Sequence, residues 1–281
     1  MDVRQNRTID KVIILGCGES ILDLSNEEID YINRCKTVIA LNKFIAFYKK
    51  SNLLPTHVYF TDDHGNSLLF LQYIFDLCQK DNLHKLTFIL NQSIKSNVFQ
   101  SKTALRITKA KDYLRLCFWR HFLPPQKLLG LTNKKYFLCS NKNFYSFVTI
   151  KTWKEDMPWA QSLNVPLFHY RGSLTSTLNY CGIKYPKKEI YLIGNDFYGS
   201  NYFFEKELHN LNFDYTDWTT PLTKKEGIHF SFQNYQGTKM SDKFHIVTQN
   251  LSKSGNELFC TNPKSLLVKE KLVSFKPLLS H

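Results

Sequence analysis

Hydrophobic residues gather along this chain in short continuous runs, and most runs stop at a glycine or a polar side chain. The first, Val12–Leu15, stops at Gly16. Similar runs recur at 37–41, 57–60, 86–90, 189–193 and 257–260. Runs without polar alternation are typical of strands that a sheet buries on both faces, so we expect a mostly parallel sheet.

Helix signals fall between these runs. Ser25 and Glu28 match a capping box, which predicts a helix that starts there and runs toward Arg34. Further helices are expected at 67–79, 173–180 and 242–251, and a final one opens within 262–267. The pattern within 95–165 is weaker, where 113–122 fits a helix and 136–139 fits a strand. The alternation of strands and helices indicates an α/β fold.

The length of the chain, 281 residues, suffices for one large domain with a smaller lid, and 43% of the residues are hydrophobic. We expect residues 1–198 and 240–281 to form the α/β domain. Residues 199–239 mix polar and aromatic side chains without clean periodicity, which is typical of a lid over a ligand site.

Membrane and export signals are weak in the sequence. No apolar run approaches the roughly 18 residues that a membrane span needs, and the first residues lack the apolar core of a signal peptide. The seven cysteines are scattered without a Cys-x-x-Cys pair, which disfavours a disulfide framework and a zinc site. We therefore expect a cytoplasmic protein with reduced thiols.

The charge balance is strongly basic, with 37 Lys and Arg residues against 24 Asp and Glu residues, a formal net charge of +13. Such a charge favours an anionic partner: nucleic acid, an anionic lipid surface, or a phosphorylated or acidic sugar. The basic residues come in pairs and not in blocks of five or six, as they do on ordinary solvated surfaces.

A glycine-rich turn, Gly16–Ser20, directly follows the first predicted strand. Glycines there let backbone N–H groups approach a phosphate, and Ser20 adds a hydroxyl. The turn is half of a dinucleotide-binding pattern, but Ile21 occupies the third glycine position and Asn42 replaces the acidic residue after the second strand. This disfavours a nicotinamide-dependent oxidoreductase, and a tight turn without a ligand is the alternative.

Paired carboxylates follow the third predicted strand in Asp62–His64. Such a pair can hold a divalent metal through a diphosphate. The spacing is not the Asp-x-Asp that is usual in nucleotide-sugar enzymes, so a polar loop is the favoured interpretation and no metal site is expected.

The strand Ile190–Ile193 ends at Gly194, and Tyr198 and Tyr202 follow shortly after it. Two phenols close together can hydrogen-bond a departing phosphate without a metal. His229, within the expected lid, has a side chain that can activate a sugar hydroxyl near neutral pH. Ordinary packing is the alternative for each of these three side chains.

Together these motifs resemble the bacterial sialyltransferases of glycosyltransferase family 42, which act on lipooligosaccharide. The family has a Gly-Asn-Gly-Pro-Ser turn, an Asn after the second strand, an Arg leading a helix, a Gly-x-Asp-Phe-Tyr segment and a lid His followed by Ser. The counterparts here, in the same order, are Gly16–Ser20, Asn42, Arg171, Gly194–Tyr198, and His229 with Ser231. A last match at Leu258–Leu267 extends the resemblance over Lys11 to Leu267.

This resemblance implies an inverting, metal-independent transferase with CMP-sialic acid as donor and a galactoside of lipooligosaccharide or capsule as acceptor. It implies a single Rossmann-like nucleotide-binding domain, a variant of the GT-A type, with the lid on the acceptor side. No cofactor is implied, because the CMP-sugar is a substrate. By position, His229 would take the proton from the acceptor hydroxyl, and Tyr198 and Tyr202 would bind the leaving phosphate.

Other roles carried over by position concern the donor. Gly18 and Ser20 would hold the nucleotide phosphate, Asn42 and Ser173 would contact the donor sugar or its carboxylate, and Arg171 would help to position acceptor or donor. Asp196 would sit near the nucleoside. The whole expected donor and nucleotide set is Gly16, Cys17, Gly18, Ser20, Asn42, Lys43, Thr61, Arg171, Gly172, Ser173, Gly194, Asp196 and Phe197.

Several positions around the donor depart from the family pattern. Cys17 replaces an Asn, Lys43 replaces a Gln, Leu174 replaces a Ser, and Thr61 or Asp62 stands near a family Asn. Another CMP-activated nonulosonic acid, of the Kdo or legionaminic type, therefore stays open as the donor. A non-catalytic nucleotide- or carbohydrate-binding protein on the same fold is the alternative from another class.

The expected partners are a CMP-activated sugar donor and a glycolipid or oligosaccharide acceptor, and no nucleic acid. The basic surface suggests peripheral contact with an anionic membrane at its inner face. A homo-oligomer is left open.

Overall fold

The computed structural model describes a defined set of residues: 7–61, 67–83, 85–99, 102–119, 137–139, 145–152, 157–199, 202–211, 227–229, 231–234 and 237–279. Its centre is an eight-stranded sheet in which every pair of neighbouring strands is parallel. In spatial order the strands are β10 (Ser274–Phe275), β9 (Glu257–Cys260), β8 (Glu189–Ile193), β1 (Ile9–Leu15), β2 (Cys35–Leu41), β3 (His57–Phe60), β4 (Leu86–Asn91) and β7 (Tyr145–Ile150).

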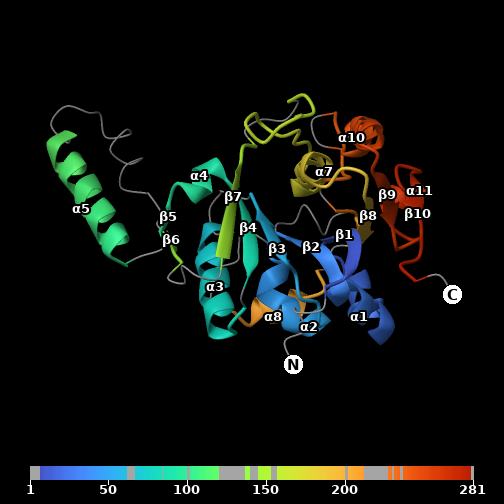
Figure 1. Ribbon diagram of the computed structural model, residues 1–281, viewed down its shortest axis with the longest axis horizontal. Helices are drawn as coiled ribbons and strands as arrows, with labels where there is room; N and C mark the ends of the chain where they lie inside the picture. Colours follow the sequence, from blue (N-terminus) through green and yellow to red (C-terminus); the bar gives the residue numbers. More distant parts are fainter. Residues whose placement is uncertain are drawn as a thin grey trace.

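Helices cover both faces of this sheet (Figure 1). On one face lie α7 (Ser173–Lys184) and α10 (Ser241–Lys253). The opposite face carries α1 (Asn26–Arg34), α2 (Tyr48–Ser51), α3 (Ser67–Lys80) and α8 (Glu205–His209). The predicted α/β fold with a mostly parallel sheet is therefore confirmed.

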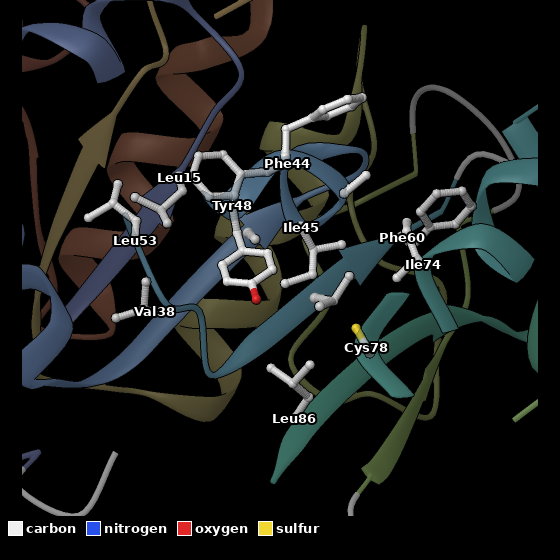
Figure 2. Packing of buried hydrophobic residues seen from close by; sticks show 14 of the residues in the cluster. Leu15, Val38, Phe44, Ile45, Tyr48, Leu53, Phe60, Ile74, Cys78 and Leu86 are labelled. Atoms are coloured by element: carbon white, nitrogen blue, oxygen red, sulfur yellow. The ribbon is translucent and has the colours of Figure 1, made fainter. Parts of the chain in front are cut away.

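The continuous apolar runs explain this layering, because successive side chains of a strand point to opposite faces. In β1, Ile13 and Leu15 pack into one hydrophobic cluster, and Val12 and Ile14 pack into the other. Figure 2 shows the first cluster, where Leu15 and Val38 of the sheet meet residues such as Phe44. Both faces need apolar residues, so the strands show no polar alternation.

The predicted elements with the clearest patterns are confirmed. The strand expected at 57–60 has those bounds, and the helix expected at 67–79 is α3. The capping box is formed: the Glu28 N–H donates to Ser25 Oγ at 3.2 Å, and the Ser25 N–H donates to Glu28 Oε2 at 2.9 Å.

The middle of the chain differs most from the expectation. β7 was not predicted, yet it pairs with β4 over its whole length and stacks Phe147 on Phe88 at a centroid distance of 5.8 Å. β7 is an edge strand, and its Ser146 and Thr149 are exposed. These polar residues break up the continuous hydrophobic run from which other strands were predicted. Segment 136–139 contributes β6 (Phe137–Leu138), which pairs with β5 (Val98–Phe99) and not with the main sheet.

The helix expected at 113–122 starts earlier, as α5 (Lys102–Trp119), and residues 120–122 lie outside the described part. This helix lies away from the main sheet (Figure 1) and exposes Ile107, Tyr113 and Leu114 by 51–67%. No helix within the described residues is long and apolar enough to cross a bilayer. None of the seven cysteines, all of which lie in the described part of the chain, forms a disulfide.

The expected lid, 199–239, is described only in part. Its described residues include α8, whose Leu208 packs into the first cluster, and the short segments 227–229, 231–234 and 237–239. Residues 200, 201, 212–226, 230, 235 and 236 of the expected lid lie outside the described part.

Candidate active site

The sheet reverses its strand order between β1 and β8. β1 has β2 on one side and β8 on the other, with Val12 to Leu15 aligned against Ile190 to Ile193. In open α/β sheets, ligands bind outside the carboxyl ends of the strands at such a reversal. The segments that follow β1 and β8 are the turn Gly16–Ser20 and the loop Gly194–Tyr198, so two of the sequence motifs meet at this point.

The glycine turn lies directly against the loop that follows β8. The Gly18 N–H donates to the Gly194 carbonyl at 2.8 Å, and the Gly16 N–H donates to the Ile193 carbonyl at the same distance. A Cβ on Gly18 would lie 2.2 Å from Asp196 Oδ2, and Gly194, at φ +66°, would place a Cβ 2.5 Å from Ile21. These close approaches require glycine.

Asp196 lies at the centre of a polar cluster below this turn. The residue is 3% exposed, and its carboxylate accepts the Ser20 N–H at 3.0 Å and the Ser20 hydroxyl at 2.5 Å. It also accepts from Asn262 Nδ2 at 2.8 Å. Asn262 Nδ2 donates in addition to the Tyr198 hydroxyl at 3.0 Å. We call Ser20, Asp196, Tyr198 and Asn262 the aspartate cluster.

The two tyrosines approach the glycine turn by different routes. Tyr198, 36% exposed, is tied to the turn through Asn262 and Asp196. Burial raises the pKa of Tyr198 above its ordinary value, so the phenol keeps its proton at neutral pH. Tyr202 forms an antiparallel backbone bridge with Gly18 and stacks its ring on Phe204 at 5.2 Å.

A second polar cluster lies on the other side of β1, at the ends of β2 and β3. Asn42 Nδ2 donates to Ser173 Oγ at 3.1 Å, and Ser173 Oγ lies 3.2 Å from Thr61 Oγ1. Ser173 is the first residue of α7, so the positive end of that helix dipole faces the cluster. We call Asn42, Thr61 and Ser173 the hydroxyl cluster.

His229 lies on a short segment that runs antiparallel to the loop after β8. The His229 N–H donates to the Phe197 carbonyl at 3.0 Å, and Ile228 forms a backbone bridge with Tyr198. The imidazole also meets the Phe197 ring edge-on at 5.5 Å. Phe197 has φ +60°, a left-handed conformation that is unusual for a bulky side chain.

The His229 side chain is uncharged at neutral pH, but it is a weaker base than a free imidazole. Burial lowers the pKa of its imidazole to about 4, so the ring is neutral at pH 7. The Ser231 N–H donates to His229 Nδ1 at 3.3 Å, which occupies the basic lone pair in this structure. Proton transfer therefore requires the imidazole to exchange this long hydrogen bond for one with a substrate hydroxyl.

The segment after His229 reaches the start of α7. Arg171 Nη2 donates to the Gln233 carbonyl at 3.1 Å, and a Cβ on Gly172 would lie 3.1 Å from Ser231 Oγ. The His229 segment is thus fixed at the loop after β8 on one side and at α7 on the other. It links the neighbourhoods of the two clusters.

Two further expected donor residues have structural contacts. Cys17 donates its thiol to the Leu41 carbonyl at 3.7 Å, and burial raises the thiol pKa to about 12. Lys43 Nζ lies 5.9 Å from the centroid of the Phe70 ring.

The expectation of no metal site involves Asp62–His64, which lie outside the described residues. Elsewhere, the described part of the chain contains no group of three or more His, Cys, Asp or Glu residues that could hold a metal ion.

Three contributors to the site were not assigned to it from the sequence. Asn262 belongs to the turn after β9, Ser231 was noted only as the Ser that follows the histidine, and Gln233 was not noted. Their contacts depend on loops that fold back on each other, which hydrophobic periodicity does not report. From the sequence, Asn262 before Lys264 indicates at most a turn in which the Asn side chain accepts a backbone N–H two residues later.

Comparisons with known proteins found no matching protein-family model and no matching curated protein. Among solved structures, the chain is similar to the sialyltransferase CST-II, in a single-residue variant crystallised in complex with CMP. This similarity has 19% sequence identity and a TM-score of 0.44, over 97% of this chain and 89% of that one. A structure of monomeric CstII is similar at 16% identity and a TM-score of 0.39, over 96% and 87% of the two chains.

Proposed function

We propose that this protein is a glycosyltransferase that moves sialic acid from CMP-sialic acid to a galactoside hydroxyl, with inversion and without a metal. The observation that supports it most is that the segments of Tyr198 and His229 meet where the sheet reverses its strand order. One antiparallel contact joins them: Ile228 forms a backbone bridge with Tyr198, and the His229 N–H donates to the Phe197 carbonyl. Adjacent segments therefore carry a protonated phenol and a neutral imidazole. Departure of a phosphate and activation of an alcohol need these two groups.

In the proposed reaction the acceptor oxygen attacks the anomeric carbon of the donor from the face opposite to the phosphate. The carbon–oxygen bond to CMP breaks, and CMP leaves with the electron pair. His229 takes the proton of the acceptor hydroxyl. Tyr198, assisted by Tyr202, donates a hydrogen bond to the phosphate oxygen on which negative charge develops, worth about 2–4 kcal/mol by comparison with oxyanion donors.

The hydroxyl cluster fits the other end of the donor. A nonulosonic acid carries a carboxylate on the reacting carbon, and the start of α7 offers Ser173, Asn42 and Thr61 as neutral hydrogen-bonding groups beside a helix N-terminus. The positive dipole end favours an anion there. Kdo and legionaminic-type sugars share this carboxylate, so the proposal names sialic acid first among CMP-activated nonulosonic acids.

Peripheral contact with an anionic membrane is part of the same proposal. Helix α5 has five basic residues and exposes Ile107 and Leu114, which lie on one helical face seven residues apart. Apolar residues between basic ones are typical of helices that lie on anionic lipid. Sedimentation with phosphatidylglycerol vesicles should carry the protein down, and the pair of substitutions Ile107→Asp and Leu114→Asp should abolish this.

The experiment that tests the function is a thermal-shift panel with CMP, UDP, GDP and NAD, followed by a transfer assay with CMP-sialic acid and lactose in EDTA. We expect stabilisation by CMP alone and transfer that survives EDTA. Stabilisation by NAD would favour an oxidoreductase. CMP binding without transfer to any acceptor would favour a non-catalytic binding protein, and rescue of lost activity by Mg²⁺ would contradict metal independence.

A further inference from the structure

Asn262 occupies a position that sequence reasoning did not assign to the site. It follows β9 in a turn that is fastened to the loop after β8. The Ser265 hydroxyl donates to the Asn195 carbonyl at 2.7 Å, and the Leu266 N–H donates to the Asp196 carbonyl at 3.0 Å. The turn therefore holds Asn262 beside the aspartate cluster independently of its own side chain.

The orientation of the Asn262 amide follows from its neighbours. The Lys264 N–H can only donate, and it lies 2.9 Å from one end of the amide, so that end is the oxygen. The NH₂ group therefore faces Asp196 and Tyr198, at 2.8 and 3.0 Å. A carboxylate can only accept, which agrees with this assignment.

In these contacts the amide oxygen accepts one hydrogen bond, and each hydrogen of the NH₂ group is donated once. One hydrogen of the NH₂ group goes to the Asp196 carboxylate, and the other goes to the Tyr198 oxygen. Because the Tyr198 oxygen accepts this bond, the hydrogen of its own hydroxyl must point away from Asn262. Tyr198 is the most exposed member of the cluster, and Asp196, at its other end, is buried.

The charges around Tyr198 are mixed, since the carboxylates of Asp196, Asp23 and Glu19 act on its hydroxyl and a lysine lies near its ring. Lys269, an exposed residue of α11 (Leu266–Lys269), has its Nζ 5.9 Å from the centroid of the Tyr198 ring. A hydroxyl that accepts one hydrogen bond becomes a stronger donor in another, because neighbouring bonds polarise each other. The contact from Asn262 therefore both directs and strengthens donation by Tyr198.

We propose that Asn262 is a positioning residue that aims the Tyr198 hydroxyl at the phosphate of the departing CMP. This inference rests on the proposed function, and it adds a residue that acts on the reaction only through Tyr198. Asp196 fixes the amide relative to the glycine turn, because its Oδ1 accepts from both the Ser20 hydroxyl and Asn262 Nδ2 while its Oδ2 accepts the Ser20 N–H.

The test is a double-mutant cycle between Asn262→Ala and Tyr198→Phe, measured as kcat and as KM for the CMP-sugar. Loss of the hydrogen bond from Asn262 to the Tyr198 hydroxyl should lower kcat about 5- to 10-fold in Asn262→Ala, with the KM for the CMP-sugar nearly unchanged. Tyr198→Phe should cost more, and the double variant should equal Tyr198→Phe alone. Additive losses, or wild-type kcat in Asn262→Ala, would overturn the proposal.

A second variant separates positioning from folding. Asn262→Ser keeps an oxygen for the Lys264 N–H and has a single hydrogen, which should go to the charged Asp196 and leave Tyr198 unheld. We expect its Tm near that of the wild type and its kcat as low as that of Asn262→Ala. Wild-type kcat in this folded variant would also overturn the proposal.

The matched control is Asn256, another amide beside β9 but at its amino end. Its Nδ2 donates to the Tyr185 carbonyl at 2.6 Å and to the Lys188 carbonyl at 3.2 Å. Asn256→Ala should lower Tm without changing kcat. If the wild type itself neither binds CMP nor transfers sugar, the proposed function fails. If it does both and the cycle is additive, only the role of Asn262 fails.

Discussion

The aspartate cluster and the hydroxyl cluster flank β1 at the same edge of the sheet, but they are built differently. In the aspartate cluster a buried carboxylate accepts three hydrogen bonds of 2.5–3.0 Å, and each donated hydrogen has one assigned acceptor. In the hydroxyl cluster, neutral groups that can donate or accept lie 3.1–3.2 Å apart. The first is a fixed framework for the backbone, and the second can rearrange around a ligand.

The largest expected effect is on the aspartate cluster. Asp196→Ala leaves the Ser20 N–H, the Ser20 hydroxyl and the Asn262 amide without their acceptor. We expect the free energy of unfolding to fall by about 3 kcal/mol, because hydrogen bonds to a charged group are strong and the half-buried donors lose their acceptor. Urea denaturation measures this. If Asp196→Ala lost less unfolding free energy than Ser173→Ala, the aspartate cluster would not be the more rigid of the two clusters.

The next effect concerns the segment that links the two neighbourhoods. His229→Ala should lower kcat at least about 100-fold, which corresponds to about 2.7 kcal/mol, because the acceptor hydroxyl loses its base. CMP should still raise the Tm, since both clusters remain intact. His57→Gln, which changes a buried imidazole at the amino end of β3, serves as the control and should keep kcat. Full activity in His229→Ala would remove the imidazole from the reaction.

The pH dependence separates activity from stability. Burial lowers the pKa of His229 to about 4 from an ordinary value near 6.5, so the acid limb of kcat/KM should fall near pH 4. Below pH 6.5 the unfolded chain binds a proton that the folded chain does not bind until about pH 4. The free energy of unfolding should therefore decrease as the pH falls from 6.5 to 4, and this residue should contribute about 1–3 kcal/mol to the decrease.

His57 has its pKa lowered to about 4 by burial as well, which offers a comparison. His229→Gln and His57→Gln should each flatten the fall in unfolding free energy between pH 6.5 and 4. Only the first should change the activity profile. Chemical denaturation at a series of pH values checks this, and an acid limb near pH 6.5 would contradict the buried state of His229 during turnover.

The smallest expected effect is on the hydroxyl cluster. Ser173→Ala should cost less than about 1 kcal/mol in unfolding free energy, because Asn42 and Thr61 can turn to other partners or to water. Its effect should instead appear as a KM for the CMP-sugar raised about 5- to 10-fold, with kcat little changed. Steady-state kinetics measures both constants. A kcat loss at constant KM would place Ser173 with the reacting groups.

Patterns in the sequence predicted the fold where burial is two-sided. The runs around Val12 and Ile190 must be apolar on both faces, so they stand out as strands. The edge strands β7 and β10 were missed, because half-exposed or two-residue strands leave little pattern. The glycine turn, Asn42 and Gly194 were found because they come directly after predicted strands.

The rest of the site depends on tertiary contacts that no local pattern contains. Asn262 matters only because the turn after β9 folds onto the Asp196 backbone. Tyr202 was predicted as a partner of Tyr198 from its spacing, but its ring position is set by stacking on Phe204, a core residue. In the structure Tyr198 and Tyr202 both lie beside the glycine turn, and the roles predicted for them stay predictions.

The backbone of Phe197 has a consequence for how Tyr198 and His229, the two proposed reacting groups, keep their relative placement. A bulky residue held in the left-handed region stores about 1–2 kcal/mol of strain, which the surrounding packing must offset. The centroid of its ring lies 4.8 Å from that of Phe232, and its carbonyl accepts the His229 N–H. Phe197 therefore restrains the backbone between Tyr198 and His229. We expect Phe197→Gly to relieve the strain and to loosen the placement of Tyr198 relative to His229.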